Sequence, residues 1–163
     1  MLEFSLDNEL KPEVEAMWDL LANAEFQRRI HIEGLGFQKY ELASEEERDG
    51  VLHRVANIIP RVDMPGPVKK VLGETMAYQE FTTFDRAKKD WNWHLKMSGP
   101  SSKVHVGGHI DLLPGRGGFG CIRRTSFEVE CKLFGVGKLI EKTVKQETLA
   151  NYEKAARFIN ANS

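Results

Sequence analysis

The sequence lacks the features that would place it across a membrane, outside the cell or on a nucleic acid. Its apolar runs are far too short to span a bilayer. An export signal, which has a charged stretch followed by an apolar one, is not expected at the N-terminus. Its 23 basic and 24 acidic side chains nearly cancel, which argues against a broad electrostatic surface for nucleic acid. The 163 residues are 41% hydrophobic and 29% charged, as expected for one globular domain over residues 1–163 with a real core.

Cysteine is scarce as well. Cys121 and Cys131 are the only two, and they lie on what we expect to be one continuous strand. Strand geometry would separate them by about 33 Å, too far for a disulfide between them. Reduced thiols therefore predict a cytoplasmic protein.

Neither proline nor glycine follows Gly137, and this C-terminal segment predicts one long helix. A helix ending at Ile159 would be about 35 Å long, enough to cross a domain of this size. Charged residues, Glu147 among them, mostly take the solvent side. Apolar or small residues recur at the three- and four-residue spacing of one buried stripe: Val136, Leu139, Ile140, Thr143, Val144, Thr148, Tyr152, Ala155, Ala156 and Ile159.

The chain before this helix reads mainly as strands in series. The first strand is expected at Leu2–Leu6 and ends at a turn formed by Asp7 and Asn8. Two short helices follow, and the second ends before Gly34. We take the acidic run Ser44–Gly50 as a solvated turn. The remaining strands are expected at 35–42, 51–59, 75–84, 89–97, 104–112 and 119–131.

The segment after Pro60 differs in kind from its surroundings. Prolines fix a bend at residues 64–67, and only about one helical turn fits before Gly73. We interpret it as a flap between the third and fourth strands that gates a cavity. The expected gate residues are Met64, Val68, Val71 and Leu72.

A strand, two helices, six antiparallel strands and a long C-terminal helix resemble the START-like superfamily, also called SRPBCC or helix-grip. The residues that carry the resemblance are Phe4, Pro12, Trp18, Asp49-Gly50-Val51, Pro65 and the stretch Phe134–Glu141. That last stretch is similar to a bacterial branch whose members have no assigned function. The resemblance implies an α+β fold, in which a curved antiparallel sheet of about seven strands wraps around the C-terminal helix. Members generally hold an apolar ligand between sheet and helix, a minority are enzymes, and several act through protein contact.

Motifs for dedicated chemistry are weak. His105 and His109 lie about 13 Å apart along a strand, which is beyond chelation unless the glycines between them bend it sharply. The glycine-rich run Gly115–Gly120 leads into a strand, which favours a hairpin turn over a phosphate loop. No nucleophile elbow is present, and a lone Cys121 is typical of a core. We therefore expect no metal, no cofactor and no assigned catalytic residue.

One pattern on the inner face of the sheet is sharper. Pairing Met97 with Val104 places Trp93 opposite Gly108, and an analogous pairing across the next turn places Gly108 opposite Arg123. A ligand could then reach the sheet between an aromatic ring and a cation. Alternatively, Trp93 fills the space over Gly108 and a bulge turns Arg123 outward. An inward Arg123 must be paired, which would predict a ligand carboxylate or phosphate.

We expect a cavity that binds a hydrophobic or amphipathic molecule such as a lipid or polyketide, and transport of that molecule is left open. Two alternatives also stay open: an enzyme of the cyclase, hydratase or aromatase kind using Arg123, Glu80 and Tyr152, and a protein-interaction module whose cavity is collapsed. Glu80 could equally form an outward ion pair. No nucleic-acid partner and no transmembrane segment are expected, and the oligomeric state, a dimer included, is open. The expected ligand-binding residues are Tyr78, Glu80, Trp91, Trp93, Val106, Gly108, Ile110, Arg123, Phe127 and Tyr152.

Overall fold

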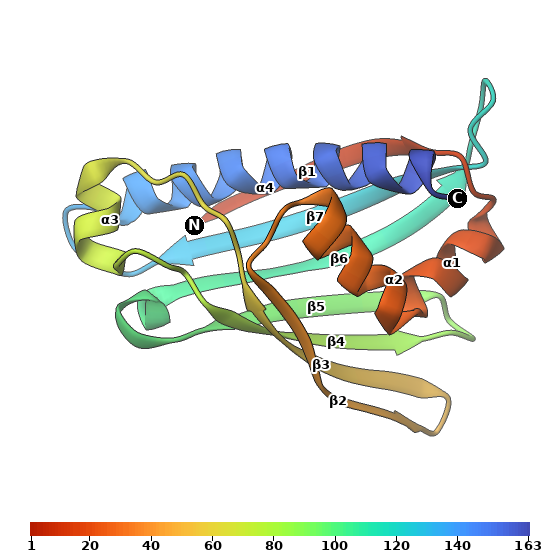
Figure 1. Ribbon diagram of the computed structural model, residues 1–163, viewed down its shortest axis with the longest axis horizontal. Coiled ribbons are helices and arrows are strands. Elements are labelled where there is room, and N and C mark those ends of the chain that lie inside the picture. The colour runs from red at the N-terminus through yellow and green to blue at the C-terminus, as the bar shows by residue number, and fades with distance from the viewer.

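A seven-stranded antiparallel sheet and one long helix form the body of the protein (Figure 1). The computed structural model describes residues 1–163, apart from the side chain of residue 100. The strand order is β1-β7-β6-β5-β4-β3-β2. The elements are β1 (Leu2–Leu10), α1 (Val14–Ala22), α2 (Ala24–Arg29), the π-helical turn η1 (Ile30–Gly34), β2 (Lys39–Arg48), β3 (Val51–Ile59), α3 (Gly66–Leu72), β4 (Tyr78–Asp85), β5 (Asp90–Met97), the 3-10 turn η2 (Gly99–Lys103), β6 (Val104–Pro114), β7 (Cys121–Cys131) and α4 (Gly137–Ala161).

The C-terminal helix is a wall of the core, as the sequence predicts. α4 has 25 residues and packs along β1 and β7, and Figure 1 shows it running lengthwise beside them. Its buried residues include Ile140, Thr143 and Ile159, which belong to the predicted stripe. The α+β helix-grip architecture is thereby confirmed. No helix in the described part of the chain combines the length and apolarity required to cross a membrane.

Aromatic side chains join the N-terminal helices to the sheet. The α1 residues Met17, Trp18 and Leu21 share one helical face and are all buried. Trp18 stacks on Phe84 of β4 with a centroid distance of 5.0 Å and lies 6.4 Å from the ring of Trp91 on β5. Because each fully buried large apolar side chain contributes roughly 1.5–3 kcal/mol, this cluster fixes α1 over one end of the sheet.

The first strand is longer than the sequence suggests. Asp7 and Asn8 are not a turn but pair with Arg124 and Arg123 of β7. The long β7 supplies hydrogen-bond partners beyond Leu6, and Asp7 Oδ2 lies 2.9 Å from Arg124 Nη2 on the outer face. Tertiary pairing thus overrides the turn preference of an Asp-Asn pair.

The acidic run is likewise not the turn it was predicted to be. β2 continues to Arg48 against β3, with a register shift between Leu42 and Ser44. Only Asp49 and Gly50 turn the chain, with φ of 53° and 78°. Such positive φ values at both central residues suit a tight two-residue hairpin.

The two cysteines are free and buried near opposite ends of β7, which confirms the expectation that they do not bond to each other.

Candidate functional site

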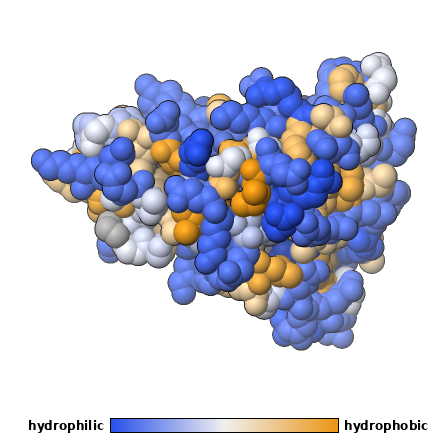
Figure 2. Space-filling view, in the orientation of Figure 1, coloured by the Kyte–Doolittle hydropathy of each residue, from blue (hydrophilic) through white to orange (hydrophobic). Residues whose placement is uncertain are grey.

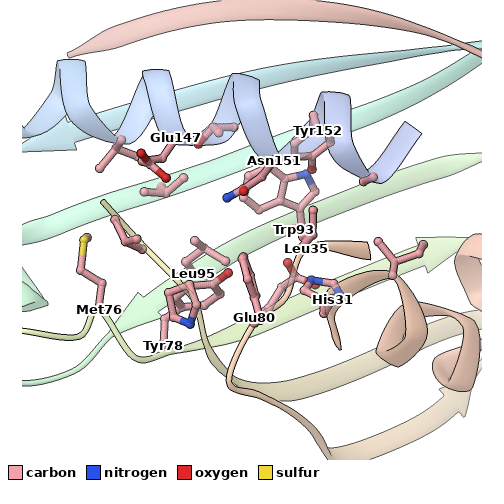
Figure 3. A pocket seen from close by; sticks show the side chains of 18 of the residues that line it. His31, Leu35, Met76, Tyr78, Glu80, Trp93, Leu95, Glu147, Asn151 and Tyr152 are labelled. Carbon is pink, nitrogen blue, oxygen red and sulfur yellow. The ribbon is translucent and has the colours of Figure 1, made fainter. Parts of the chain in front are cut away.

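A cavity of about 170 Å³ lies between the inner face of the sheet and α4. Figure 3 shows Glu147, Asn151 and Tyr152 of α4 facing the sheet residues Tyr78, Glu80, Trp93 and Leu95 across it. His31 and Leu35, from η1 and the residue after it, line a third side. In Figure 2 apolar side chains gather near the middle of this face of the molecule, surrounded by hydrophilic ones.

The structure brings most of the expected ligand-binding residues to this cavity. Eight line it: Tyr78, Glu80, Trp91, Trp93, Val106, Ile110, Arg123 and Tyr152. Gly108 and Phe127 are not among the lining residues described. The indole of Trp93 covers Gly108, and the ring of Phe127 packs edge-on against Tyr152 with a centroid distance of 5.0 Å.

One of the two predicted strand registers is correct and the other is wrong. Trp93 lies opposite Gly108, as predicted. Gly108, however, lies opposite Phe127, and Arg123 lies opposite Leu112. The six-residue loop between Pro114 and Cys121 starts two residues later than expected, so the register shifts by four positions, an even number. Because side chains alternate with a period of two, Arg123 and Phe127 keep their inward orientation.

The expected gate residues lie away from the cavity lining. Val68 and Leu72 are each 1% exposed and belong to the core, and α3 packs against η2. Val71 is on the surface, and Met64 is half-buried. The lining residues nearest in sequence to these four are Pro60, Val62 and Met76, on either side of residues 64–72. The gating role assigned to residues 64–72 stays a prediction.

Several lining residues were not predicted. Thr143, Glu147 and Asn151 follow one another at four-residue spacing along α4, which places them on a single line of the helix surface. This spacing was visible in the sequence, but Glu147 was expected on the solvent side. The N-terminal half contributes a second unpredicted group: Leu21, Gln27, Ile30, His31, Leu35 and Phe37.

Glu80 is the carboxyl group whose protonation the cavity alters most clearly. Burial raises its pKa to about 7, and the positive charge of Arg54 partly opposes this rise. Among the described residues, no ion pair or side-chain hydrogen bond satisfies its carboxylate. Glu80 is therefore partly protonated near neutral pH, whereas a solvated glutamate is almost fully ionised there.

The neighbouring cavity groups are neutral at the same pH. Burial lowers the pKa of His31 to about 4, and its Nδ1 donates to the carbonyl of Gln27 at 2.7 Å, so Nε2 is left as an acceptor. Burial also raises the pKa of Tyr78 and Tyr152 well above the usual range, and the charge of Glu80 adds to both shifts. An acid, a neutral imidazole and two phenols thus line one cavity.

Arg123 is inside the protein and not turned outward by a bulge. It is 4% exposed, and its Nη2 donates to Asn8 Oδ1 at 3.0 Å and to the Tyr152 carbonyl at 3.3 Å. Its guanidinium carbon lies 4.7 Å from the centre of the Tyr152 ring. Burial lowers the pKa of Arg123, yet an arginine keeps its charge.

The described residues contain no cluster of three or more side chains placed to hold a metal ion. His109 Nε2 instead lies 2.9 Å from Asp111 Oδ1 on the outer face of the sheet.

Solved structures share this fold at low sequence identity. TTHA0849 from Thermus thermophilus matches with a TM-score of 0.68 and 14% identity over 99% of this chain and 100% of that one. The Zhui aromatase/cyclase from Streptomyces sp. R1128 matches with a TM-score of 0.65 and 13% identity over 97% and 92%. Norcoclaurine synthase from Thalictrum flavum matches with a TM-score of 0.63 and 16% identity over 97% and 86%.

The fold is therefore that of the START-like, or helix-grip, superfamily that the sequence resembles. The chain belongs to the family described as a protein of unknown function (DUF2505), whose model matches residues 6–161. No curated protein matches the sequence. At these identities the solved structures establish the fold alone.

Proposed function

We propose that this protein binds a small hydrophobic or amphipathic molecule between the sheet and α4. The observation that carries the proposal is the cavity of about 170 Å³, lined mostly by aromatic and aliphatic side chains with a few polar groups. An engineered cavity of roughly 150 Å³ accepts benzene, so a compact ring-bearing molecule such as a polyketide fragment suits this one better than a long-chain lipid.

The comparisons add support of a general kind. Structures with this fold include an aromatase/cyclase and a norcoclaurine synthase in complex with dopamine and hydroxybenzaldehyde. Ring-bearing compounds thus occupy at least one protein of similar fold. Trp91, Trp93 and Tyr152 would supply aromatic surface to such a ring in this chain.

Native mass spectrometry of the protein purified from its own host tests the proposal. We expect an adduct of defined mass that unfolding releases. Ala155 lines the cavity, so Ala155→Phe should fill it and abolish the adduct. Ala150 is on the exposed side of the same helix, and Ala150→Phe should keep the adduct. A wild-type protein without adduct, or an adduct equally abundant on both variants, would contradict ligand binding here.

A second candidate function is catalysis of the cyclase or hydratase kind. It is favoured by Glu80, whose pKa of about 7 is suited to proton transfer, in a cavity also lined by Tyr78 and Tyr152. Glu80→Gln keeps the shape of the side chain and removes the proton. The variant purified from the host should then hold an unreacted precursor whose mass differs from that of the wild-type ligand. The same ligand on both proteins would argue for binding without turnover.

The remaining alternatives receive less support. A protein-interaction module with a collapsed cavity would have side chains filling the space between sheet and α4, and open volume is found there.

We assign the protein to the cytoplasm because Cys121 and Cys131 are free thiols.

A further inference from the structure

The cavity contains a buried cation without a counter-ion. Both hydrogen bonds that Arg123 makes to described residues come from Nη2, and both acceptors are uncharged: the Asn8 amide oxygen and the Tyr152 carbonyl. Its buried Nε has no partner, and no described residue accepts from Nη1. Stacking on Tyr152 compensates part of the lost hydration. An isolated buried charge is nevertheless costly, and proteins normally pair it.

The acidic groups that line the cavity do not supply the missing charge. The cation that lowers the pKa of Glu80 is Arg54, and Arg123 does not contribute. Burial and the negative charge of Asp63 raise the pKa of Glu147, and the positive charge of Lys154 lowers it. Neither carboxylate forms an ion pair with Arg123 among the described residues.

The remaining titratable neighbours of Arg123 are uncharged. Burial raises the pKa of the Cys121 thiol to about 11, and it raises that of Tyr152 further above the neutral range. Both groups are therefore protonated at neutral pH. Arg123 is also the only lysine or arginine among the described lining residues.

A second buried donor in the cavity is also unpaired. Trp93 Nε1 has no hydrogen-bond partner among the described residues. Its ring lies 5.8 Å from that of Phe127, which contacts Tyr152, the residue on which Arg123 stacks. This part of the cavity wall therefore contains buried hydrogen-bond donors that have no acceptor among the described residues.

We infer that the ligand carries a single carboxylate, bound by Arg123, attached to an apolar ring-bearing body that occupies the rest of the cavity. The inference rests on the proposed binding function and specifies its ligand class. One cation in an apolar cavity matches one negative charge. A phosphate dianion would leave a second charge without a partner in a poorly hydrated space.

Two probes of equal shape test the inference by isothermal titration calorimetry at neutral pH: 1-naphthaleneacetate and its neutral amide. Wild-type protein should bind the acid more tightly than the amide, by about tenfold or more. Arg123→Met should abolish this preference, because the acid loses more affinity than the amide. The matched control is Arg124→Met, because Arg124 is exposed on the outer face and pairs with Asp7. It should keep the preference.

A second variant leaves the arginine in place. Asn8→Asp puts a carboxylate where Arg123 already donates at 3.0 Å, and so supplies an internal counter-ion. We expect affinity for the acid to fall by about tenfold or more while the amide binds as before. This variant tests the inference even if Arg123→Met does not fold.

The outcomes separate this inference from the function on which it rests. Equal binding of acid and amide by the wild type would overturn the inference that the ligand carries a carboxylate. It would still support an apolar binding cavity. Tighter binding of 1-naphthyl phosphate than of 1-naphthaleneacetate would overturn the choice of a monoanion. If none of the three probes binds, the proposed ligand-binding function and the inference fall together.

Discussion

Trp93 lies directly over Gly108, so that a Cβ atom on this glycine would stand 2.5 Å from Cζ2 of the indole. The same atom would stand 2.5 Å from the backbone oxygen of Ser126. The space that the sequence suggested as open to a ligand is therefore occupied by protein, and the cavity lies on the α4 side of the indole.

Replacing Gly108 with valine should destabilise the protein by about 2 kcal/mol or more, because neither the buried indole nor the strand backbone can move away freely. Urea unfolding measures the change. The control is Gly107→Val, where the nearest atom to an added Cβ is 3.4 Å away and the side chain would point to the outer face. Equal stability of the two variants would show that the inner surface over Gly108 can adapt.

Glu80 should make the protein less stable as pH rises. Its pKa is about 7 in the folded protein against 4.5 for the ordinary side chain, so between these values the folded state holds the proton and the unfolded state has released it. The stabilisation from the protonated Glu80 is complete below about pH 4.5. It is lost as pH rises through 7, by about 3 kcal/mol in all.

Glu80→Gln should therefore be more stable than wild type at pH 8 and similar to it at pH 4.5. Thermal melting across this range provides the measurement, and comparing the two proteins cancels the opposite contribution of His31. Glu128→Gln, on the exposed outer face, serves as control. A pH-independent difference between Glu80→Gln and wild type would contradict the raised pKa.

Arg54 holds the end of α1 against the sheet. It is 3% exposed and donates to the carbonyls of Leu21 and Ala22, which are among the last of that helix. Arg54→Met should cost about 2 kcal/mol of stability by leaving the Ala22 carbonyl unpaired, since Leu21 keeps the hydrogen bond from Gln27 Nε2. Arg48→Met on the exposed β2 should cost little. Arg54→Met should also raise the pKa of Glu80, which NMR titration can follow. An unchanged Glu80 titration would show that another group sets this pKa.

The C-terminal helix should be indispensable for folding. A chain ending at Gly137 would leave the inner face of the sheet in water, and we expect it to be insoluble or molten. Calorimetry and circular dichroism decide between this and a folded product. A soluble fragment that melts cooperatively would overturn the role of α4 as a wall of the core.

The sequence predicts those features of the fold that follow from periodicity. Alternation in the segment 89–97 predicts that Trp91 and Trp93 face inward, and both are buried and line the cavity. The stripe of the last helix is predicted in the main: Ile140 and Ile159 are buried, whereas Leu139 is exposed. The register between β6 and β7 could not be predicted this way, because it depends on where in the glycine-rich run the turn begins. Gly117 and Gly118, at φ of 60° and 90°, lie at the centre of the loop that forms, which starts two residues later than expected.

The cavity is less predictable from the sequence, because three separate segments build it. Glu147 resembles any solvated helical glutamate until the sheet is placed beneath it. Residues 30–37 follow no single helical or strand period, since a π-helical turn ends there and passes into a loop. His31 reaches the cavity through that irregular backbone, which a periodic pattern does not reveal.

The acidic run that forms part of β2 affects whether copies of the protein aggregate in solution. β2 is an outer strand of the sheet, with unpaired backbone groups along one side, and residues 41–48 are exposed on both faces (Figure 1). Such a strand is a template for edge-to-edge aggregation. Glu45, Glu46 and Glu47 oppose it, because a second chain aligned there would bring carboxylates against carboxylates. Lowering the pH or adding salt weakens this repulsion, so the edge is best protected in neutral solution of low ionic strength.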